Sequence, residues 1–461
     1  MIKYTGFEHF LEESNKTRPD AVLFVYEKDG SIHSSTVSHF YSDVLHRAAD
    51  FKLMGKKCAA FICDGSYPSV VAIFASVLSG MQTVLLDEHA PASLLELQLE
   101  ETDAEMLLGD AELAEELRPF LRTDASPGIS EAKPHQILFF TSGTTSQVKA
   151  VILTDQSLMA SAWNGSTLLP LDESDTLLNL LPMNHVFGFV CGMLWGLQCG
   201  ARVALGRGPR HSLEDLSYFR PTVISAVPLL LSFLMKFNVL NEELRLILIG
   251  AGSCPRELFD SVSAMGIRIA YGYGLTETSS GVALSTEGDP NAMRTCPDVT
   301  ISLSDDGEIL IEAGDLMMTG YYKRPEDTAA ALIGDILITG DLGRLDEEGK
   351  LYITGRKKEI LLLADGTKIF LPEYEMKLQT VLPDREYAVI EYSQVPVLII
   401  RGQSEERPAI LEALKKVMAD YPRGQQLRGI YFTKRPLPRT ATGKVQRWIL
   451  ENRMKEGPDA L

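Results

Sequence analysis

The first 300 residues alternate between short apolar runs and longer segments whose apolar residues share one helical face. The runs at 58–63 and 83–86 have the length of buried strands, and the segments at 67–78 and 91–102 have the apolar spacing of helices. Repeated alternation of strands and helices is typical of a parallel sheet covered by helices. The pattern therefore predicts an α/β fold for this part of the chain.

The pattern changes near residue 300, where strands follow one another without long helices between them. Apolar runs at 299–303, 308–312, 336–339 and 350–353 are separated by Asp-Gly, Glu-Gly and Gly-Asp turns. Short strands joined by such turns predict a small antiparallel or barrel-like unit.

The cationic stretch Gly-Arg-Lys-Lys at 355–358 ends this unit. Beyond it, helical segments such as 407–420 alternate with strands such as 396–400, which predicts an α+β unit. We therefore expect an N-terminal domain at 1–355, which includes the β-rich subdomain, and a C-terminal domain at 356–461.

A polar loop lies between the apolar runs 137–140 and 151–153. It contains hydroxyl side chains, one glycine and one lysine, namely Thr141, Ser142, Gly143, Thr144, Thr145 and Lys149. Hydroxyls, exposed backbone N–H groups and a lysine ammonium are groups that hold phosphate oxygens. The loop is therefore a candidate phosphate-binding site, and a surface hairpin rich in serine and threonine is the alternative interpretation.

The loop differs from the common nucleotide-binding sequence Gly-x4-Gly-Lys-Ser/Thr. Counted from Gly143, Val148 occupies the place of the second glycine and Ala150 the place of the hydroxyl residue. A kinase or GTPase of that type is therefore disfavoured.

The most apolar segment of the chain, at 186–201, contains a glutamine and is followed by an arginine. It is shorter than the about 18 uncharged residues that a membrane span needs, so we expect a buried helix. Gly188, Gly192 and Gly196 recur every fourth residue and share one helix face. Such a stripe either lets another element pack closely or leaves a groove for an apolar ligand.

The chain has 461 residues, with 44 lysines and arginines, 62 aspartates and glutamates, and a formal net charge of −18. Such a surface repels nucleic acid and anionic membranes, so neither is an expected partner. The six cysteines form no Cys-x-x-Cys pair, which favours buried thiols in a reducing compartment. The first residues lack the features of a signal peptide. We expect a cytoplasmic protein without an integral membrane segment.

Six stretches together resemble the motifs of the adenylate-forming superfamily, which includes acyl-CoA synthetases, adenylation domains of peptide synthetases and luciferases. They lie at 141–149, 250–253, 273–277, 339–341, 355–356 and 438–444. The resemblance covers nearly the whole chain. It implies a large N-terminal part of stacked α/β sheets with a small β-barrel, followed by a mobile C-terminal α+β domain.

The resemblance also implies a reaction and its cofactors. With Mg²⁺, ATP and a small carboxylic acid would give an acyl-adenylate and pyrophosphate. The acyl group would then pass to the thiol of CoA or of a phosphopantetheine on an acyl carrier protein. Because carboxylate and phosphate are both anions, such a reaction needs positioning and charge neutralisation more than covalent help.

Motif positions of the superfamily carry over to residues of this chain. The implied nucleotide-binding residues are Thr141, Ser142, Gly143, Thr144, Thr145 and Lys149 for the β- and γ-phosphates, Gly250, Ala251, Gly252, Tyr273 and Gly274 around the adenine, Asp341 for the ribose, and Arg356 for ribose or phosphate. Glu277 would hold Mg²⁺, a hard ion that prefers carboxylate oxygen, and Thr276 would contact the α-phosphate. Taken alone, Glu277 also fits a helix-start glutamate, and Asp341 fits a turn residue.

Three further residues have implied roles. Lys444 would lie against the carboxylate and α-phosphate oxygens during adenylation. Lys358 occupies the hinge position, about which the C-terminal domain would rotate to withdraw Lys444 and admit the thiol. His185 matches a position that lines the acyl site, and a satisfied core histidine is the alternative.

The chain also departs from the superfamily pattern. Ser146, Val148 and Ala150 replace a glycine, a proline and a glycine of the phosphate loop. Side chains at former glycine positions limit positive φ, so we expect slower or altered loop closure. The segment 185–196 lacks the aspartate with which amino-acid-activating members pair an α-ammonium. Its absence, beside apolar neighbours, favours an acid without an α-amino group.

We therefore predict an AMP-forming acid–thiol ligase for a fatty or aryl acid. The alternatives are an amino-acid- or carrier-protein-loading adenylation enzyme, a nucleotide-binding homologue that has lost ligase activity, and a luciferase-like oxygenase. The altered phosphate loop supports the inactive homologue, whereas retention of Glu277, Asp341 and Lys444 argues against it.

Overall fold

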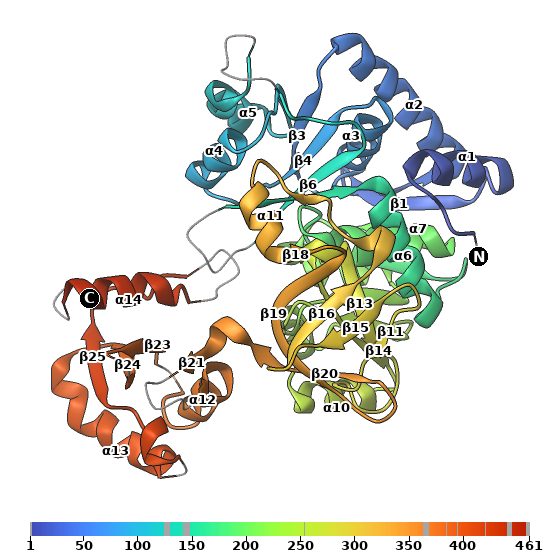
Figure 1. Cartoon of the computed structure of the whole chain (residues 1–461). Helices are drawn as coiled ribbons and strands as arrows, with labels where there is room; N and C mark the ends of the chain where they lie inside the picture. The colour runs from blue at the N-terminus through green and yellow to red at the C-terminus, as the bar shows by residue number, and fades with distance from the viewer. Residues whose placement is uncertain are drawn as a thin grey trace.

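The computed structural model describes residues 2–123, 130–141, 148–252, 254–362, 368–383, 385–393, 395–419, 421–439 and 445–457. The chain up to Arg356 forms two large sheets and one small sheet, and most of the later elements lie at one side of them (Figure 1). This arrangement confirms the predicted α/β fold class. No helix within the described ranges is both long and apolar enough to cross a bilayer.

The first large sheet has six strands in the order β17-β7-β6-β4-β3-β5. They are β3 (Cys58–Cys63), β4 (Gln82–Asp87), β5 (Met106–Leu108), β6 (Gln136–Phe140), β7 (Ala150–Thr154) and β17 (Gly320–Tyr321). β3 to β6 are parallel and are connected by α3 (Tyr67–Leu78), α4 (Ala92–Glu100) and α5 (Ala111–Leu117), whereas β7 and β17 are antiparallel additions. Every residue of β3 is buried, as expected for a parallel strand covered on both faces.

The second large sheet has nine strands in the order β14-β13-β12-β11-β10-β8-β9-β1-β2. They are β1 (Val22–Lys28), β2 (Ser31–Thr36), β8 (Thr176–Asn179), β9 (Arg202–Leu205), β10 (Val223–Ala226), β11 (Leu246–Ile249), β12 (Arg268–Leu275), β13 (Ser280–Ser285) and β14 (Arg294–Thr295). The strands from β12 to β1 in this order are parallel neighbours, and the outer strands are antiparallel. The helices α8 (Ser212–Phe219), α9 (Pro228–Phe237) and α10 (Arg256–Ala264) alternate with its strands.

Both large sheets share one apolar core. Phe139 of β6 and Leu177 of β8 belong to the same cluster of buried side chains. The helices α1 (Phe7–Thr17), α2 (Val37–Met54), α6 (Asp155–Leu168) and α7 (Trp195–Cys199) contribute to it. Phe7 stacks on Phe74 of α3 with ring centroids 4.1 Å apart. The shared core fixes the two sheets relative to each other, and therefore also the loops at their carboxyl edges.

The segment after residue 299 forms an antiparallel sheet, as predicted. Its strands are β15 (Thr300–Leu303), β16 (Glu308–Glu312), β18 (Leu332–Ile333), β19 (Ile336–Leu345) and β20 (Leu351–Arg356). The short helix α11 (Pro325–Ala331) lies between β17 and β18 in the chain. β19 pairs with three of these strands and is the centre of the sheet.

The residues after Arg356 build apolar cores of their own. Their elements are η6 (Lys357–Glu359), β21 (Ile360–Leu362), β22 (Lys368–Phe370), α12 (Leu371–Gln379), β23 (Tyr387–Tyr392), β24 (Val395–Arg401), α13 (Arg407–Met418), β25 (Gly429–Thr433) and α14 (Arg447–Glu456). Tyr374, Leu398 and Ile410 pack together, and Leu450 packs in a second cluster on the sheet β23-β24-β25. These elements have the expected α+β character, and a domain division at residue 356 stays a prediction.

The most apolar segment forms a π-helix, η2 (Phe187–Leu194), followed by α7, where we expected one regular helix. Its glycines lie against neighbouring chain. A β-carbon on Gly188 would be 2.2 Å from the Pro182 carbonyl oxygen, and one on Gly192 would be 2.4 Å from Asn179 Oδ1. The glycine stripe therefore serves close packing and leaves no groove for an apolar ligand.

Substitution of Gly188 by alanine is expected to destabilise the protein. Because the blocking atom is a backbone carbonyl, the helix must shift, at a cost of about 1–3 kcal/mol. Urea unfolding measures this cost. Gly165→Ala in α6 is the control, since a β-carbon there meets nothing within 4 Å. Equal midpoints for Gly188→Ala and the parent protein would contradict close packing.

Candidate active site

The candidate nucleotide-binding residues follow the carboxyl ends of parallel strands. The turn 250–252 comes after β11, and the adjacent strand β12 carries Tyr273 and Gly274 before the 3-10 turn η4 (Thr276–Thr278). Loops from neighbouring strands meet at this edge of an α/β sheet, where ligands bind. Pairing of β11 with β12 thus brings two of the sequence motifs side by side.

The turn after β11 is tightly held. Gly250 lies against Phe187, where a β-carbon would come within 2.9 Å of the ring. Ala251 has φ of 60°, a left-handed conformation that is uncommon for residues with a side chain. The Tyr271 hydroxyl donates to the Gly252 carbonyl at 2.8 Å. A fixed turn with one strained residue has the character of a ligand-binding turn.

Gly274 is required by the backbone itself. The pairing of β12 with β13 shifts register between Tyr273 and Gly274. A β-carbon on Gly274 would lie 1.7 Å from the Ser280 carbonyl oxygen. Bulges of this kind change the direction of the side chains that follow, and here those are Thr276 and Glu277.

A buried carboxylate connects three predicted site residues. Asp341 of β19 is 2% exposed. Its Oδ2 accepts the Tyr273 hydroxyl at 2.8 Å, and its Oδ1 lies 2.7 Å from Arg356 Nε on the neighbouring strand β20. Burial and the charge of Asp341 raise the pKa of Tyr273, so its hydroxyl stays a donor at neutral pH. Stacking of Tyr273 on adenine stays a prediction.

A second cluster surrounds Tyr321 of β17. Its hydroxyl donates to Glu277 Oε1 at 2.7 Å, and its ring centroid lies 5.2 Å from Lys149 Nζ. Lys149 also forms an ion pair with Asp327 of α11, with Nζ 2.6 Å from Oδ1. Burial and the charge of Glu277 raise the pKa of Tyr321, so the proton of this hydrogen bond is retained. One tyrosine thus links the predicted phosphate ligand to the predicted metal ligand.

Tyr321 and Asp327 are not among the site residues predicted from the sequence. β17 is two residues long and joins the first sheet by pairing Tyr321 with Val151 of β7. A strand this short has no measurable period, so the local sequence does not indicate that it lies beside the phosphate loop. Only the three-dimensional pairing brings these side chains to the site.

His185 is half-buried just before the π-helix. Burial lowers the pKa of its imidazole, an effect that nearby Asp87 only partly opposes. The ring is therefore neutral at pH 7 and offers one donor and one acceptor. Among the apolar residues behind it, Val190 and Met193 are buried in the core, and half-buried Phe187 reaches the turn after β11.

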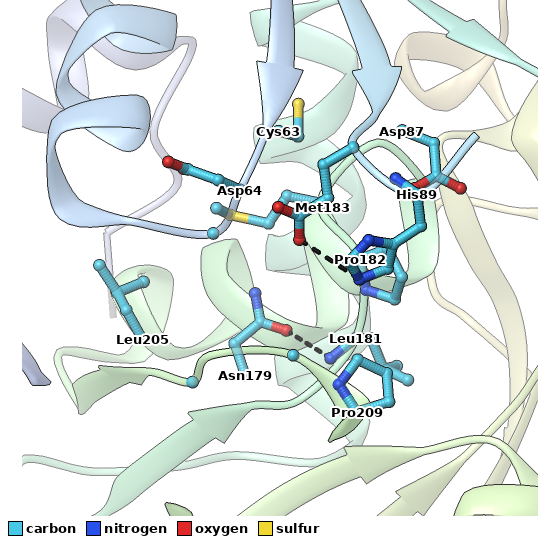
Figure 2. A pocket seen from close by; sticks show the side chains of 14 residues that line it. Cys63, Asp64, Asp87, His89, Asn179, Leu181, Pro182, Met183, Leu205 and Pro209 are labelled. Atoms are coloured by element: carbon cyan, nitrogen blue, oxygen red, sulfur yellow. Dashed lines mark hydrogen bonds and ion pairs between the residues drawn. The ribbon is translucent and has the colours of Figure 1, made fainter. Parts of the chain in front are cut away.

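A cavity lies at the junction of the two large sheets. Figure 2 shows its lining, which comes from the ends of β3, β4 and β8 and includes Cys63, Asp87 and Leu181. A larger hollow of about 580 Å³ adjoins it and shares Asp64 and His89. The carboxyl edges of both sheets are therefore accessible from outside at this junction.

The end of β20 is tied to the small sheet. Lys357 Nζ lies 2.7 Å from Glu308 Oε2 and 2.8 Å from Asp306 Oδ2. Glu308 also accepts the Gly340 N–H at 2.8 Å. The next residue is Lys358, the predicted hinge, whose backbone belongs to η6 and whose side chain lies outside the described part of the structure.

Several predicted site residues lie outside the described residues, namely Ser142, Gly143, Thr144, Thr145 and Lys444. Thr141 is half-buried, and its N–H donates to the Lys149 carbonyl at 3.1 Å, which continues the β6–β7 pairing by one bond. Thr276 is half-buried at the start of η4.

The donor chemistry around Glu277 fits a magnesium ion shared with a nucleotide. Mg²⁺ usually takes one or two carboxylates, substrate phosphates and water. In the ranges that the structure describes, no group of three or more His, Cys, Asp or Glu side chains gathers into a metal cage. Half-buried Glu277, which Tyr321 links to Lys149, suits a site of this shared kind.

Comparison with known proteins gives a family model and several relatives. The model described as AMP-binding enzyme matches residues 11–322. The 2-succinylbenzoate–CoA ligase of Bacillus cytotoxicus is 28% identical over 438 residues, covering 87% of this chain and 89% of that protein. The long-chain-fatty-acid–CoA ligase of Bacillus subtilis is 27% identical over 357 residues, covering 70% of this chain and 62% of that protein.

Solved structures share the fold over nearly the whole chain. O-succinylbenzoate coenzyme A synthetase (MenE) from Bacillus subtilis, in complex with AMP, has a TM-score of 0.80 at 24% identity and covers 96% of this chain and 98% of that one. The anthranilate CoA ligase AuaEII, in complex with anthranoyl-AMP, has a TM-score of 0.78 at 20% identity and covers 98% of each chain. At these identities the likeness establishes the architecture.

Proposed function

This chain belongs to the family of AMP-binding enzymes, and from this premise we propose that it is an AMP-forming ligase that joins a carboxylic acid to the thiol of CoA. ATP and the acid give an acyl-adenylate and pyrophosphate. The acyl group then passes to sulfur, and AMP leaves. Relatives that match almost the full chain are named CoA ligases. A carrier-protein phosphopantetheine is the alternative acceptor, because it presents the same thiol.

The observation that carries the proposal is that the segment 273–277 is linked at both ends to other predicted site residues. At its start, Tyr273 donates to Asp341. At its end, Glu277 accepts from Tyr321, whose ring lies beside Lys149. A carboxylate suited to ribose hydroxyls and a cation suited to phosphates therefore flank the same segment, which supports one nucleotide lying along it.

In this proposal, Asp341 accepts hydrogen bonds from the ribose hydroxyls and shares its charge with Arg356. Lys149 and Thr141 hold the phosphates that leave as pyrophosphate, and residues 142–145 complete that loop. Mg²⁺, when bound at Glu277, would neutralise charge on the phosphate oxygens. Thr276 donates to the α-phosphate, and the residues around the adenine are Gly250, Ala251, Gly252, Tyr273 and Gly274.

The acid is proposed to be a fatty or aryl acid without an α-amino group. The segment 185–196 has no aspartate to pair with an α-ammonium. His185, neutral because of its burial, positions the acid without forming an ion pair. The relatives named for 2-succinylbenzoate and for long-chain fatty acids support this class of substrate.

Purified protein with Mg-ATP, CoA and single acids tests the proposal. We expect AMP, pyrophosphate and an acyl-CoA from at least one aryl or fatty acid, and no pyrophosphate exchange with amino acids. Exchange with amino acids alone would overturn the substrate class. Binding of ATP without turnover of any acid, with CoA or with a phosphopantetheinyl carrier protein, would favour the ligase-inactive homologue.

The proposal places the protein in the cytoplasm. The cysteines Cys58, Cys63, Cys191, Cys199, Cys254 and Cys296 are free thiols in the structure. Free thiols in this number suit a reducing compartment, where ATP and CoA are also found.

A further inference from the structure

Lys149, the cation that the proposed function assigns to the nucleotide phosphates, already forms an ion pair with Asp327. Nζ and Oδ1 are 2.6 Å apart, and the two side chains are 25% and 32% exposed. The pair is partly shielded from water, yet a ligand can still reach the ammonium. A phosphate that binds Lys149 must therefore share it with this carboxylate or displace the carboxylate.

The backbone of Asp327 stays near Lys149, because the chain before α11 is anchored. The Tyr322 hydroxyl donates to Asp103 Oδ2 at 2.6 Å, and Lys323 Nζ lies 3.0 Å from Oδ1 of the same carboxylate. Asp103 itself is 1% exposed, so these bonds are shielded from water. The chain that carries Asp327 is thus anchored where its carboxylate pairs with Lys149.

Lys149 is oriented even without Asp327. It directly precedes β7, and its carbonyl accepts the Thr141 N–H at 3.1 Å. Its ammonium lies 5.2 Å from the ring centroid of Tyr321, and an aromatic face attracts a cation at this distance. Loss of the Asp327 charge would therefore free the lysine without misplacing it.

We propose that Asp327 is an internal competitor of ATP and pyrophosphate for Lys149. The inference rests on the proposed function, because it takes Lys149 as a phosphate ligand. Only molecules in which the Lys149–Asp327 ion pair is open bind the phosphates fully. The apparent dissociation constant for ATP or pyrophosphate is therefore the intrinsic constant divided by the fraction of open molecules. For a partly exposed ion pair, we expect this to raise the dissociation constant about two- to fivefold.

The competition acts on both sides of the first half-reaction. ATP binds less tightly because of this competition. Pyrophosphate also binds less tightly, because it consists of the two phosphates that Lys149 held in ATP. When Asp327 pairs with Lys149 again, it favours the release of pyrophosphate. Product release limits the turnover of many enzymes. Asp327 is therefore a residue that sets the affinity of the phosphate site without being a ligand of it.

Asp327→Asn tests the inference, because it keeps the size of the side chain and removes its charge. Calorimetric titration of the full chain with Mg-ATP, and separately with magnesium pyrophosphate, gives dissociation constants without any acid and hence without turnover. We expect both constants to fall by about two- to fivefold. Unchanged or higher constants would assign the ion pair a purely structural role and overturn the inference.

Glu326→Gln is the matched control. Glu326 precedes Asp327 in the same helix and is exposed, so this substitution removes an equal charge away from Lys149. The dissociation constants of this variant are expected to equal those of the parent. Equal tightening in both variants would indicate a general charge effect and overturn the inference.

A second cycle separates the inference from the proposed function. In a Lys149→Gln background, Asp327→Asn is expected to leave the Mg-ATP dissociation constant unchanged, and a persistent effect would overturn the competition. A parent protein that binds no Mg-ATP would overturn both the proposed function and the inference. Binding by the parent with no response to Asp327→Asn would overturn the inference alone.

Discussion

Lys444→Ala is expected to slow acyl-adenylate formation by about 10²–10³-fold and to leave acyl transfer from a supplied acyl-adenylate nearly unchanged. In the first half-reaction a carboxylate attacks the α-phosphate, so two anions must approach each other. A lysine ammonium placed between them offsets this repulsion, which alanine cannot do. In the second half-reaction the thiol attacks an uncharged acyl carbon, and the same cation is not needed.

The two half-reactions can be measured separately. Pyrophosphate exchange reports adenylation, and the formation of acyl-CoA from synthetic acyl-adenylate reports transfer. Lys434→Ala is the control, because Lys434 is an exposed lysine of the same part of the chain, and both rates should stay at the parent level. Equal loss of both half-reactions in Lys444→Ala would contradict the role of Lys444 in adenylation alone.

Glu277→Gln has the second large expected effect. Glutamine keeps an oxygen that can accept the Tyr321 hydroxyl, so the local hydrogen bond at 2.7 Å can persist. The negative charge that a magnesium ion prefers is lost. We expect the Mg²⁺ concentration for half-maximal rate to rise at least about tenfold, and the rate at saturating Mg²⁺ to fall by about 10²-fold.

Titration of the adenylation rate with Mg²⁺ at fixed ATP measures both changes. Tyr321→Phe provides the graded comparison, because it removes only the hydrogen bond that orients Glu277. A single hydrogen bond to a charged group is worth about 1.5–3 kcal/mol, and this partly exposed one should have a smaller effect than loss of the carboxylate charge. An unaltered Mg²⁺ dependence in Glu277→Gln would remove Glu277 from the metal site.

The elements with strong local signals could be predicted from the sequence. The apolar run at 58–63 forms the buried strand β3, and the turn-rich stretch from 299 forms the antiparallel sheet. The glycine stripe was ambiguous, because spacing alone does not tell what faces Gly188. The carbonyl of Pro182 fills that space, and the segment is a π-helix, which the apolar pattern alone did not distinguish from an α-helix.

The candidate site divides in the same way. Motif order predicted Glu277, which follows β12, Asp341, which lies within β19, and Lys149, which directly precedes β7. It did not predict Tyr321 or Asp327, because their place depends on a two-residue strand that pairs with β7. It also did not predict that these two residues are the partners of Glu277 and Lys149. Partners supplied by long-range pairing leave no local pattern to read.

The ion pairs of Lys357 with Asp306 and Glu308 affect how the following residues can move. Arg356 pairs with Asp341, and Lys357 pairs with Asp306 and Glu308, so ion pairs attach both residues to the small sheet. If the C-terminal residues rotate between the two half-reactions, the hinge for that rotation begins at Lys358. A change in a few backbone torsions near Lys358 would then move residues far from this point by a large distance.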